Sequence, residues 1–436
     1  MTRKRTALIL AEAANPEWVS VPLIGWSLST AIARACDAHI VTQVRNREAF
    51  NRAGMVEGRD YTAIDTENLA RPMWKVATFL RGGKGLGWTI QTAISSITYP
   101  YFERLVWRKF GDQIRARKFD VVHRITPLTP TAPSSLAAKC RAVGTPFLLG
   151  PLNGGVPWPP GYDATRRQER EWLSYVRSVY KLMPGRHRTL ASAAALLMGS
   201  RHTMSEVPVK YQSKCIYMPE NAIEPSRFNR VASPVRDGVL RACFVGRLVP
   251  YKGPDVALEA ALPLLKAGRM RLDIVGDGPL MPMLREIVAR EGVADSVVLH
   301  GWVSHDRVQD VMSACHLLTF PSVREFGGGV VLEAMALGVV PVIVDYAGPG
   351  ELVDAAVGFK VPIGLRADIV RAYAEMLIDL STDPERLAEL GSNARQRVLD
   401  KFTWDAKAAQ VLTAYEWVCN SGAKPEFTFS AQSAPI

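Results

Sequence analysis

The sequence predicts an α/β protein built from two Rossmann-like, doubly wound domains, and three observations carry this prediction. The chain has 436 residues, more than a single hydrophobic core usually serves. Short apolar runs alternate with helical stretches, as in βαβ units. The apolar runs are rich in Val, Ile and Leu with little polar alternation, which is typical of strands covered on both faces.

The expected strands form two successive sets. The first lies at residues 7–10, 39–42, 121–123, 147–149 and 195–198, and the second at 242–245, 272–275, 297–300, 317–320 and 340–344. Helical stretches such as 254–267 and 281–291 fill the intervals. Two successive α/β sets imply two doubly wound domains.

The boundary between these domains is expected in a largely polar, proline-containing stretch at residues 219–239. We therefore predict a first domain at residues 1–225 and a second at 226–402. A C-terminal helix at 403–420 is expected to pack back toward the first domain. Residues 421–436, with Gly422 and two prolines, are expected to form a flexible tail.

Composition narrows the classes of function. The six cysteines include no Cys-x-x-Cys pair, so neither a zinc knuckle nor a disulfide framework is supported. The first apolar run, at residues 7–10, stops at Glu12 and is read as a buried strand, because it is too short for a signal peptide or a membrane span. The net charge of +11 fits nucleic acid, anionic lipid or an anionic substrate as partner.

The first chemical signal follows the strand expected at 242–245. Gly246 ends that strand, and Arg247 and Lys252 occupy the loop before the next helix. Ligands of parallel sheets sit at the carboxyl ends of strands, where two cations can neutralise a diphosphate and stabilise it as a leaving group. Taken alone, the loop is equally compatible with two ordinary surface charges.

Two weaker signals follow the next two strands. Gly276-Asp277-Gly278-Pro279 is part of a dinucleotide fingerprint, but it lacks the third glycine, where Met281 stands. The turn His300-Gly301-Trp302-Val303 is able to offer main-chain groups to a flat base, and it is equally compatible with a tight turn closed by a buried Trp.

The strongest signal is the glycine-rich segment at residues 320–338. A strand leads to Glu325-Phe326-Gly327-Gly328, and a helix is expected to open at about Gly328, where free N–H groups and the helix dipole suit a phosphate. Glu333 lies inside this helix among apolar neighbours, so its carboxylate requires a polar partner. A ribose with two vicinal hydroxyls is such a partner.

This arrangement, Glu-x7-Glu with Arg-x4-Lys and Gly-Asp-Gly-Pro upstream, closely resembles glycosyltransferase family 4, whose members have the GT-B fold. The resemblance implies two domains facing each other across a cleft and transfer of a hexose-type sugar with retention of configuration. Arg247 and Lys252 would bind the donor diphosphate, and Glu325 the hydroxyls of the donor sugar. Glu333 would hold the ribose. The remaining donor contacts would come from Gly276, Val303, Phe326, Gly327 and Gly328.

No cofactor is expected beyond a UDP-sugar or GDP-sugar as substrate, and no essential metal, because the chain lacks an apparent Asp-x-Asp motif. No carboxylate in these motifs is an evident nucleophile, so a front-face mechanism is preferred. In the first half the resemblance is thinner. Gly25 matches the family's glycine-rich loop, without its usual adjacent glycine, and is counted among the donor-binding residues. His123, read as lying at a strand end, matches a histidine near the donor sugar and is counted among the catalytic residues.

Residues 71–118 hold ten Lys or Arg and two acidic residues, interleaved with five Trp or Tyr residues. This mixture suits the surface of an anionic membrane, although a buried helix pair with a solvated basic face would look the same. The expected acceptor is a hydroxyl of a lipid-linked glycan or polysaccharide precursor. The expected location is the cytoplasm, with peripheral contact to the inner face of the membrane.

Three alternatives stay open. The first alternative is a soluble glycosyltransferase that acts on a small sugar or sugar phosphate. An NAD-type oxidoreductase would explain Gly-Asp-Gly but not Arg247, Lys252, Glu325 and Glu333 together. A non-catalytic scaffold would be expected to have lost donor residues. Binding to nucleic acid is not expected, because no basic groove with stacking residues is evident.

Overall fold

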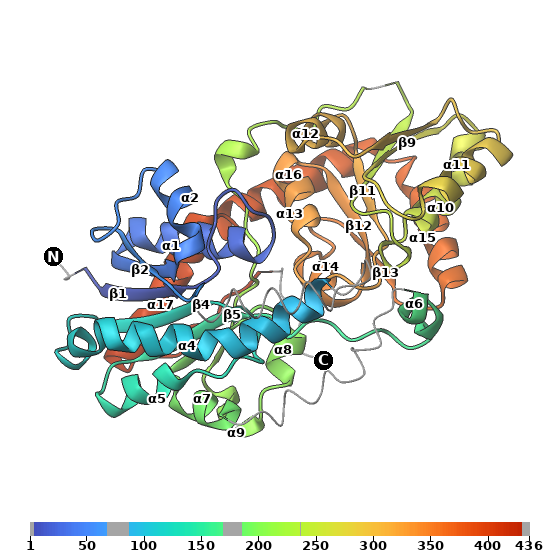
Figure 1. Ribbon diagram of the computed structural model, residues 1–436. Coiled ribbons are helices and arrows are strands. Elements are labelled where there is room, and N and C mark those ends of the chain that lie inside the picture. The colour runs from blue at the N-terminus through green and yellow to red at the C-terminus, as the bar shows by residue number, and fades with distance from the viewer. Residues whose placement is uncertain (1–3, 68–86, 169–184, 236, 430–436) are drawn as a thin grey trace. The chain divides into compact units, whose positions relative to one another are not determined.

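The computed structural model describes residues 4–67, 87–168, 185–235 and 237–429 (Figure 1). The chain divides into two compact units. Unit 1 takes residues 1–155, 170–220 and 404–427, and unit 2 takes residues 156–169, 221–403 and 428–436. Each unit contains its own parallel sheet, so the predicted α/β class with two doubly wound sheets is confirmed.

The sheet of unit 1 has seven parallel strands in the order β3-β2-β1-β4-β5-β6-β7. The chain order reverses between β1 and β4, which makes this pair the topological switch point, where open α/β sheets bind their ligands. The strands are β1 (Thr6–Ala11), β2 (Asp37–Gln43), β3 (Tyr61–Ile64), β4 (Val121–Thr126), β5 (Phe147–Leu152), β6 (Ala195–Met198) and β7 (Cys215–Tyr217).

Helices cover both faces of this sheet. Because side chains alternate along a strand, Val122 of β4 joins the core beneath the helices α4 and α5, while His123 contacts Tyr415 of α17 on the other face. The helices of unit 1 are α1 (Val21–Ala35), η1 (Val44–Asn46), α2 (Arg47–Arg52), α4 (Gly87–Arg115), α5 (Ser135–Ala142), α7 (Arg186–Ser192), α8 (Arg201–Ser205), α9 (Val209–Gln212) and α17 (Trp404–Asn420).

Unit 2 contains a six-stranded parallel sheet in the order β10-β9-β8-β11-β12-β13. Its order reverses between β8 and β11, so the switch point lies between these two strands. The strands are β8 (Leu240–Val245), β9 (Met270–Val275), β10 (Val297–Gly301), β11 (Leu317–Phe320), β12 (Val340–Asp345) and β13 (Phe359–Pro362).

The helices of unit 2 follow these strands in the expected alternation. α10 packs against α15, and α13 packs against α16. The helices of unit 2 are α6 (Asp163–Gln168), η3 (Pro225–Arg227), η4 (Pro250–Lys252), α10 (Pro254–Lys266), α11 (Met281–Arg290), α12 (His305–Ser313), α13 (Gly329–Leu337), α14 (Ala347–Leu352), α15 (Arg366–Leu380) and α16 (Pro384–Lys401).

The ten expected strands are confirmed, and three strands were missed: β3, β7 and β13. Each of these lies at an edge of its sheet and has only three or four residues. An edge strand has a neighbour on one side only, and a strand this short lacks the continuous apolar run by which central strands are recognised.

The units differ from the expected domain limits in two places, and the C-terminal helix lies in unit 1, toward which it was expected to pack. Residues 156–168 belong to unit 2, where Trp158 packs edge-on against Tyr251 and the hydroxyl of Tyr162 donates a hydrogen bond to the carbonyl of Gly364. The boundary near the middle of the chain falls between Glu220 and Asn221. After α16 the chain returns to unit 1, where α17 packs against α1 (Figure 1).

The predicted flexible tail begins after Asn420. Within the described part of this tail, Phe429 is buried, and its ring lies 5.3 Å from that of Phe402. The carbonyl of Thr428 also accepts a hydrogen bond from Lys401. These contacts attach the end of the described chain to unit 2, so residues 428 and 429 are not frayed.

Candidate functional site

The candidate site of unit 2 is built at the switch point of its sheet. Arg247 and Lys252 follow β8, and Glu325 follows β11, the strand beside it. The carboxyl ends of adjacent parallel strands meet at one edge, so the fold brings together residues that are far apart in the sequence. The sequence predicted this grouping, and the structure contains it.

Lys252 and Glu325 form an ion pair across the switch point. Nζ of Lys252 lies 3.1 Å from Oε2 of Glu325, and both side chains are largely buried. The same ammonium lies 5.6 Å from the centre of the Phe320 ring. Arg247 is exposed, and its side chain forms no hydrogen bond or ion pair among the described residues. This edge therefore has an ion-paired cation, Lys252, an ion-paired carboxylate, Glu325, and an unpaired cation, Arg247, that is available to bind an anionic ligand.

Glycines bring the loops after β8 and β9 into direct backbone contact. A Cβ on Gly276 would lie 1.9 Å from the carbonyl oxygen of Gly246, and a Cβ on Gly278 would lie 2.5 Å from that of Leu248. The amide of Gly276 donates to the carbonyl of Gly301, which ends β10. Gly276 is thus required for packing of the edge, whatever further contact its backbone makes.

The glycine-rich loop ends at the start of α13. Gly328 adopts φ +58° and is the N-cap, with no side chain satisfying the first N–H groups of the helix. The helix begins at Gly329, one residue later than expected. Its nine residues suffice to present free N–H donors and the positive end of a helix dipole to an anion.

A short helix that the sequence reasoning missed supports this loop from behind. Gly348 of α14 donates its N–H to the carbonyl of Glu325, and a Cβ there would lie 1.8 Å from the carbonyl oxygen of Phe326. The available signal was the sequence Ala-Gly-Pro-Gly immediately after the strand at 340–344. Gly348 fixes the backbone of Phe326 and Gly327 relative to β12.

Glu333 has the polar partner that its apolar neighbours required. Its Oε1 lies 3.5 Å from Nε2 of His305, which begins α12. This contact with Glu333 raises the pKa of His305 above its ordinary value, against burial and the nearby charge of Arg227. The sequence did not single out His305, because residues on different helices reveal their proximity only in the fold.

Val303 lies directly after β10 and is half-buried, at the same edge as the other candidate residues. Trp302 beside it is 80 % exposed, so the alternative of a turn closed by a buried tryptophan is wrong. An exposed aromatic ring next to this turn leaves its backbone open to a ligand.

His123 is not placed as expected. It is the third residue of β4 rather than its last, it is fully buried, and both ring nitrogens are occupied. Nδ1 lies 2.8 Å from the hydroxyl of Tyr415, and Nε2 lies 2.8 Å from the carbonyl oxygen of Gly150. Burial lowers the pKa of His123 to about 4. The expectation of a catalytic strand-end histidine is therefore corrected: His123 ties β4 to β5 and α17.

Gly25 lies within α1 rather than in a loop. A Cβ there would lie 2.2 Å from the carbonyl oxygen of Ala13, so the glycine allows α1 to approach the chain that leaves β1. Within the described residues, this close approach accounts for Gly25.

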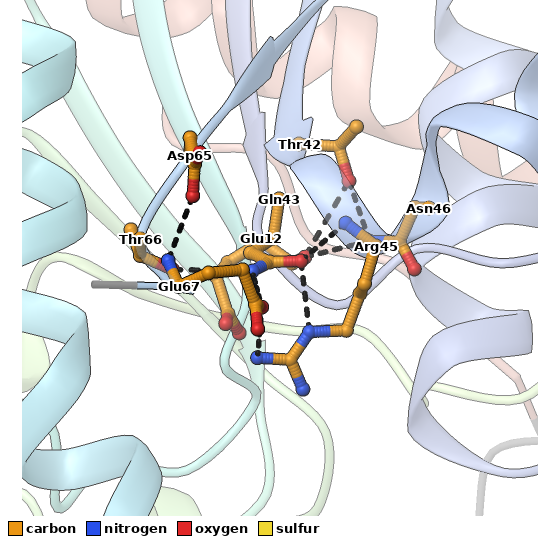
Figure 2. A network of polar contacts seen from close by, with 8 residues as sticks. All are labelled: Glu12, Thr42, Gln43, Arg45, Asn46, Asp65, Thr66 and Glu67. Carbon is orange, nitrogen blue, oxygen red and sulfur yellow. Dashed lines mark hydrogen bonds and ion pairs between the residues drawn. The ribbon is translucent and has the colours of Figure 1, made fainter. Parts of the chain in front are cut away.

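A polar network that the sequence did not reveal lies at the carboxyl ends of β1, β2 and β3 (Figure 2). Gln43 donates to Glu67 over 2.6 Å and accepts from Nε of Arg45 over 2.8 Å. Asn46 donates to the hydroxyl of Thr42 and to the carbonyl of Glu12. Burial raises the pKa of Glu12, and the charge of Arg45 opposes this shift.

The basic and aromatic segment at 71–118 is described in part; Trp74, and the side chain of Trp88, lie outside the described set. Tyr99 is buried in the core, and Trp107 is half-buried, with Arg115 and Lys139 over its ring. Glu103 is fully buried and accepts hydrogen bonds from Ser134, Ser135 and the amide of Leu136. The exposed positions include Arg104, Arg108, Lys109, Arg115, Arg117 and Lys118. No helix among the described residues is long and apolar enough to cross a membrane.

A cavity of about 600 Å³ lies at the opposite edge of the sheet of unit 2. Leu240, His316 and Gly338, among its lining residues, stand at or just before the amino ends of β8, β11 and β12. Ligands of open α/β sheets bind at the carboxyl edge, where the glycine loops and charges are found. The carboxyl edge is therefore the candidate site.

Part of the chain is similar in sequence to known glycosyltransferases. Residues 226–397 match the family of glycosyl transferases group 1. The chain is 27 % identical over 242 residues to an α-D-kanosaminyltransferase of Streptomyces kanamyceticus, covering 53 % of this chain and 62 % of that protein. It is 34 % identical over 184 residues to a D-inositol 3-phosphate glycosyltransferase of Gordonia bronchialis, covering 39 % of each chain. The matches thus span about half the length of these relatives.

Among solved structures, Anabaena Alr3699/HepE in complex with UDP superposes with a TM-score of 0.56 at 15 % identity, covering 94 % of this chain and all of that one. This likeness shows the fold, which is of the GT-B type with two Rossmann-like domains. The segment that matches the glycosyl transferases group 1, residues 226–397, lies within unit 2.

Proposed function

We propose that the chain is a retaining glycosyltransferase that moves a hexose-type sugar from a UDP-sugar or GDP-sugar to an acceptor hydroxyl. The observation that carries the proposal is the Lys252–Glu325 ion pair at the β8/β11 switch point, next to the uncapped start of α13. A cation and a helix N-terminus bind a diphosphate, while the neighbouring carboxylate accepts hydrogen bonds from sugar hydroxyls.

In this proposal Arg247 and Lys252 neutralise the diphosphate, and the N–H groups of Phe326, Gly327 and Gly328 bind phosphate and sugar oxygens. Glu325 orients the sugar, and Glu333 accepts hydrogen bonds from the ribose. Gly276 and Val303 complete the donor contacts. His123 has no part in the chemistry, because both of its ring nitrogens are engaged inside unit 1.

The proposed reaction proceeds on one face of the sugar. The bond from the anomeric carbon to the diphosphate breaks, and the acceptor hydroxyl attacks from the same side. Its proton passes to the departing diphosphate oxygen. Catalysis is then mainly positioning and electrostatic stabilisation of the leaving group, with no metal and no cofactor. Addition of EDTA should leave turnover unchanged.

For the acceptor, we propose a lipid-linked glycan or polysaccharide precursor held at the cytoplasmic face of the membrane. The exposed cations of α4 and of the residues that follow it support attraction to anionic lipid. The burial of Tyr99 and the packing of Trp107 weigh against these two rings as membrane anchors. The names of the relatives keep a soluble cyclitol or sugar phosphate as the second candidate acceptor.

The decisive experiment for the donor is a panel of UDP- and GDP-sugars, with melting temperature and slow hydrolysis as readouts. One nucleotide sugar should raise the melting temperature and release its nucleotide, and NMR of the product should show the anomeric configuration of the donor. Lys252→Ala should slow release about 30-fold or more, whereas Lys266→Ala, which removes a surface ion pair of the same unit, should not. Protection by NADH and by none of the sugars would instead indicate an oxidoreductase.

The acceptor proposal is tested by sedimentation with vesicles. Binding to vesicles that contain anionic lipid, weakened by salt, supports the lipid-linked acceptor. Equal recovery in the supernatant with neutral and anionic lipid, at low and high salt, would favour a soluble acceptor.

A further inference from the structure

The donor assignment leaves one feature of the site unexplained, the contact between His305 and Glu333. His305 begins α12 and Glu333 lies in the middle of α13, so two helices that follow different strands bring these side chains together. Nε2 of His305 lies 3.5 Å from Oε1 of Glu333. The imidazole is 39 % exposed and the carboxylate 29 % exposed, so both reach the surface where a ligand would bind.

His305 is itself held on two sides. The amide Nε2 of Gln309, one turn further along α12, lies 3.3 Å from Nδ1. The ring of Phe228 packs edge-on against the imidazole with 5.5 Å between centres. Gln309 and Phe228 are both buried and cannot turn freely. With Gln309 donating to Nδ1, the neutral imidazole carries its proton on Nε2, the nitrogen that faces Glu333.

We propose that His305 is a positioning residue that orients the Glu333 carboxylate toward the ribose hydroxyls of the donor. The inference rests on the proposed function, and it adds a residue and a pH dependence to it. A glutamate on a helix samples several rotamers, and a hydrogen bond to Oε1 selects the one in which Oε2 remains available for two vicinal hydroxyls. Buried Gln309 in turn fixes the imidazole, so the order extends from the core of unit 2 to the ligand.

The charges around His305 determine how this contact responds to pH. Glu333 faces it from α13, Arg227 from η3 and Asp306 from its own helix. Below the pKa of His305 both ring nitrogens carry a proton, so Nδ1 then faces the amide oxygen of Gln309 in place of its nitrogen, and the contact with Glu333 becomes a full ion pair. The carboxylate is then held more firmly, and selection for the ribose hydroxyls should increase as the pH falls through this pKa.

The test compares binding of UDP or GDP, whichever the wild-type chain binds more tightly, with binding of its 2′-deoxy counterpart by calorimetry. The ratio of the two dissociation constants reports on the ribose contact alone. The wild-type ratio should be about tenfold or more, as expected for hydrogen bonds to a charged group. Glu333→Gln should reduce it nearly to one, and His305→Ala should reduce it about threefold or more. His305→Gln, which keeps an N–H donor, should restore part of the loss.

Two controls separate positioning from damage to the fold. His316→Gln changes another histidine of unit 2, which lies at the amino edge of the sheet and accepts a hydrogen bond from the amide of Arg241, and should leave the ratio unchanged. Thermal unfolding at neutral pH shows that each variant is folded. In the wild type the ratio should increase from pH 8 to pH 5.5, and in His305→Gln it should not change with pH.

The outcomes distinguish this inference from the function on which it rests. A ratio that falls in Glu333→Gln but stays at the wild-type value and pH profile in His305→Ala overturns the role of His305 and leaves the donor assignment intact. If the wild-type chain binds no nucleoside diphosphate at all, the proposed function fails, and the inference fails with it.

Discussion

The carboxyl edges of the two sheets show how the same topology produces two different surfaces. In unit 1 the polar side chains after β1, β2 and β3 bind one another, as Gln43 does with Arg45 and Glu67 (Figure 2). In unit 2 the loops after β8, β9 and β11 are dominated by glycines, with an exposed Arg247 and a single ion pair between Lys252 and Glu325.

The two edges differ in the free energy that binding a ligand would cost. Side chains that satisfy each other must exchange partners before they bind a ligand, which costs free energy. Bare backbone and an unpaired cation need no such exchange. We infer that the edge of unit 2 is preorganised for an anion, whereas the described part of the edge of unit 1 is organised for stability.

The two histidines, His123 and His305, repeat the contrast. The ring nitrogens of His123 bind groups of its own unit, Tyr415 and Gly150, and burial lowers its pKa to about 4. His305 is partly exposed, and its partner Glu333 raises its pKa. One histidine is a structural residue that stays neutral, and the other lies where a ligand is expected.

Removing the cations of unit 2 is expected to have the largest effect on turnover. Lys252→Ala and Arg247→Ala should each raise the activation barrier by about 2–4 kcal/mol, because the leaving diphosphate loses a fixed positive charge. Turnover measured with saturating donor would fall correspondingly, while the melting temperature stays near that of the wild type. Lys266→Ala is the matched control. Wild-type turnover in both site variants would contradict the diphosphate assignment.

For unit 1, we predict that protonation of His123 affects the stability of the fold and not turnover. The pKa of His123 falls from 6.5 to about 4 on folding, so the folded chain binds fewer protons than the unfolded chain between these values. Stability is present above pH 6.5 and is lost as the pH falls toward 4. The loss amounts to about 3 kcal/mol.

Urea unfolding at pH 7.5 and pH 4.5 checks this sign. His123→Gln should be less stable than the wild type at pH 7.5, and the difference should shrink at pH 4.5, because glutamine does not titrate. Turnover of the folded variant should stay close to that of the wild type. A variant that is stable but inactive would restore the catalytic interpretation.

The close packing of α14 against the loop after β11 predicts an effect that acts through the backbone. Gly348→Ala places a Cβ 1.8 Å from the carbonyl oxygen of Phe326, so the loop must shift. We expect a loss of about 1–3 kcal/mol in the free energy of unfolding, as for other overpacked sites, with weaker donor binding. At Gly364 a Cβ would meet Asp368 at an ordinary 3.6 Å, so Gly364→Ala should be nearly neutral. Equal effects of the two substitutions would argue against a specific role for Gly348.

The smallest expected effect concerns the stability supplied by His305. Because its folded pKa is raised above 6.5, its contribution is complete below the unfolded pKa and is lost as the pH rises through the folded pKa. The pair is partly exposed and screened by solvent, so we expect about 0.5 kcal/mol or less. The difference in unfolding midpoint between wild type and His305→Gln should be largest near pH 5.5. A difference that increases toward pH 8 would show that the sign is wrong.

The class of fold and most of the proposed donor site follow from the sequence alone. Central strands such as β8 and β11 are continuous apolar runs, and the loops that follow them carry glycines and charges at the ends of those runs. Arg247, Lys252 and Glu325 could be named because each lies in a loop that directly follows such a strand, and Glu333 because it is an acid among apolar neighbours in the next helix. Local order along the chain is what a sequence records directly.

Contacts between side chains of different helices and strands, in contrast, are determined by the tertiary structure. His305 reaches Glu333 from another helix, Gly348 supports Phe326 from another helix, and His123 is closed off by Tyr415, which lies 292 positions further along the chain. A residue's pattern shows that it will be buried or polar, but its partner is determined by how strands order themselves in the sheet. That order depends on packing of the whole unit, for which no short stretch of sequence carries a signal.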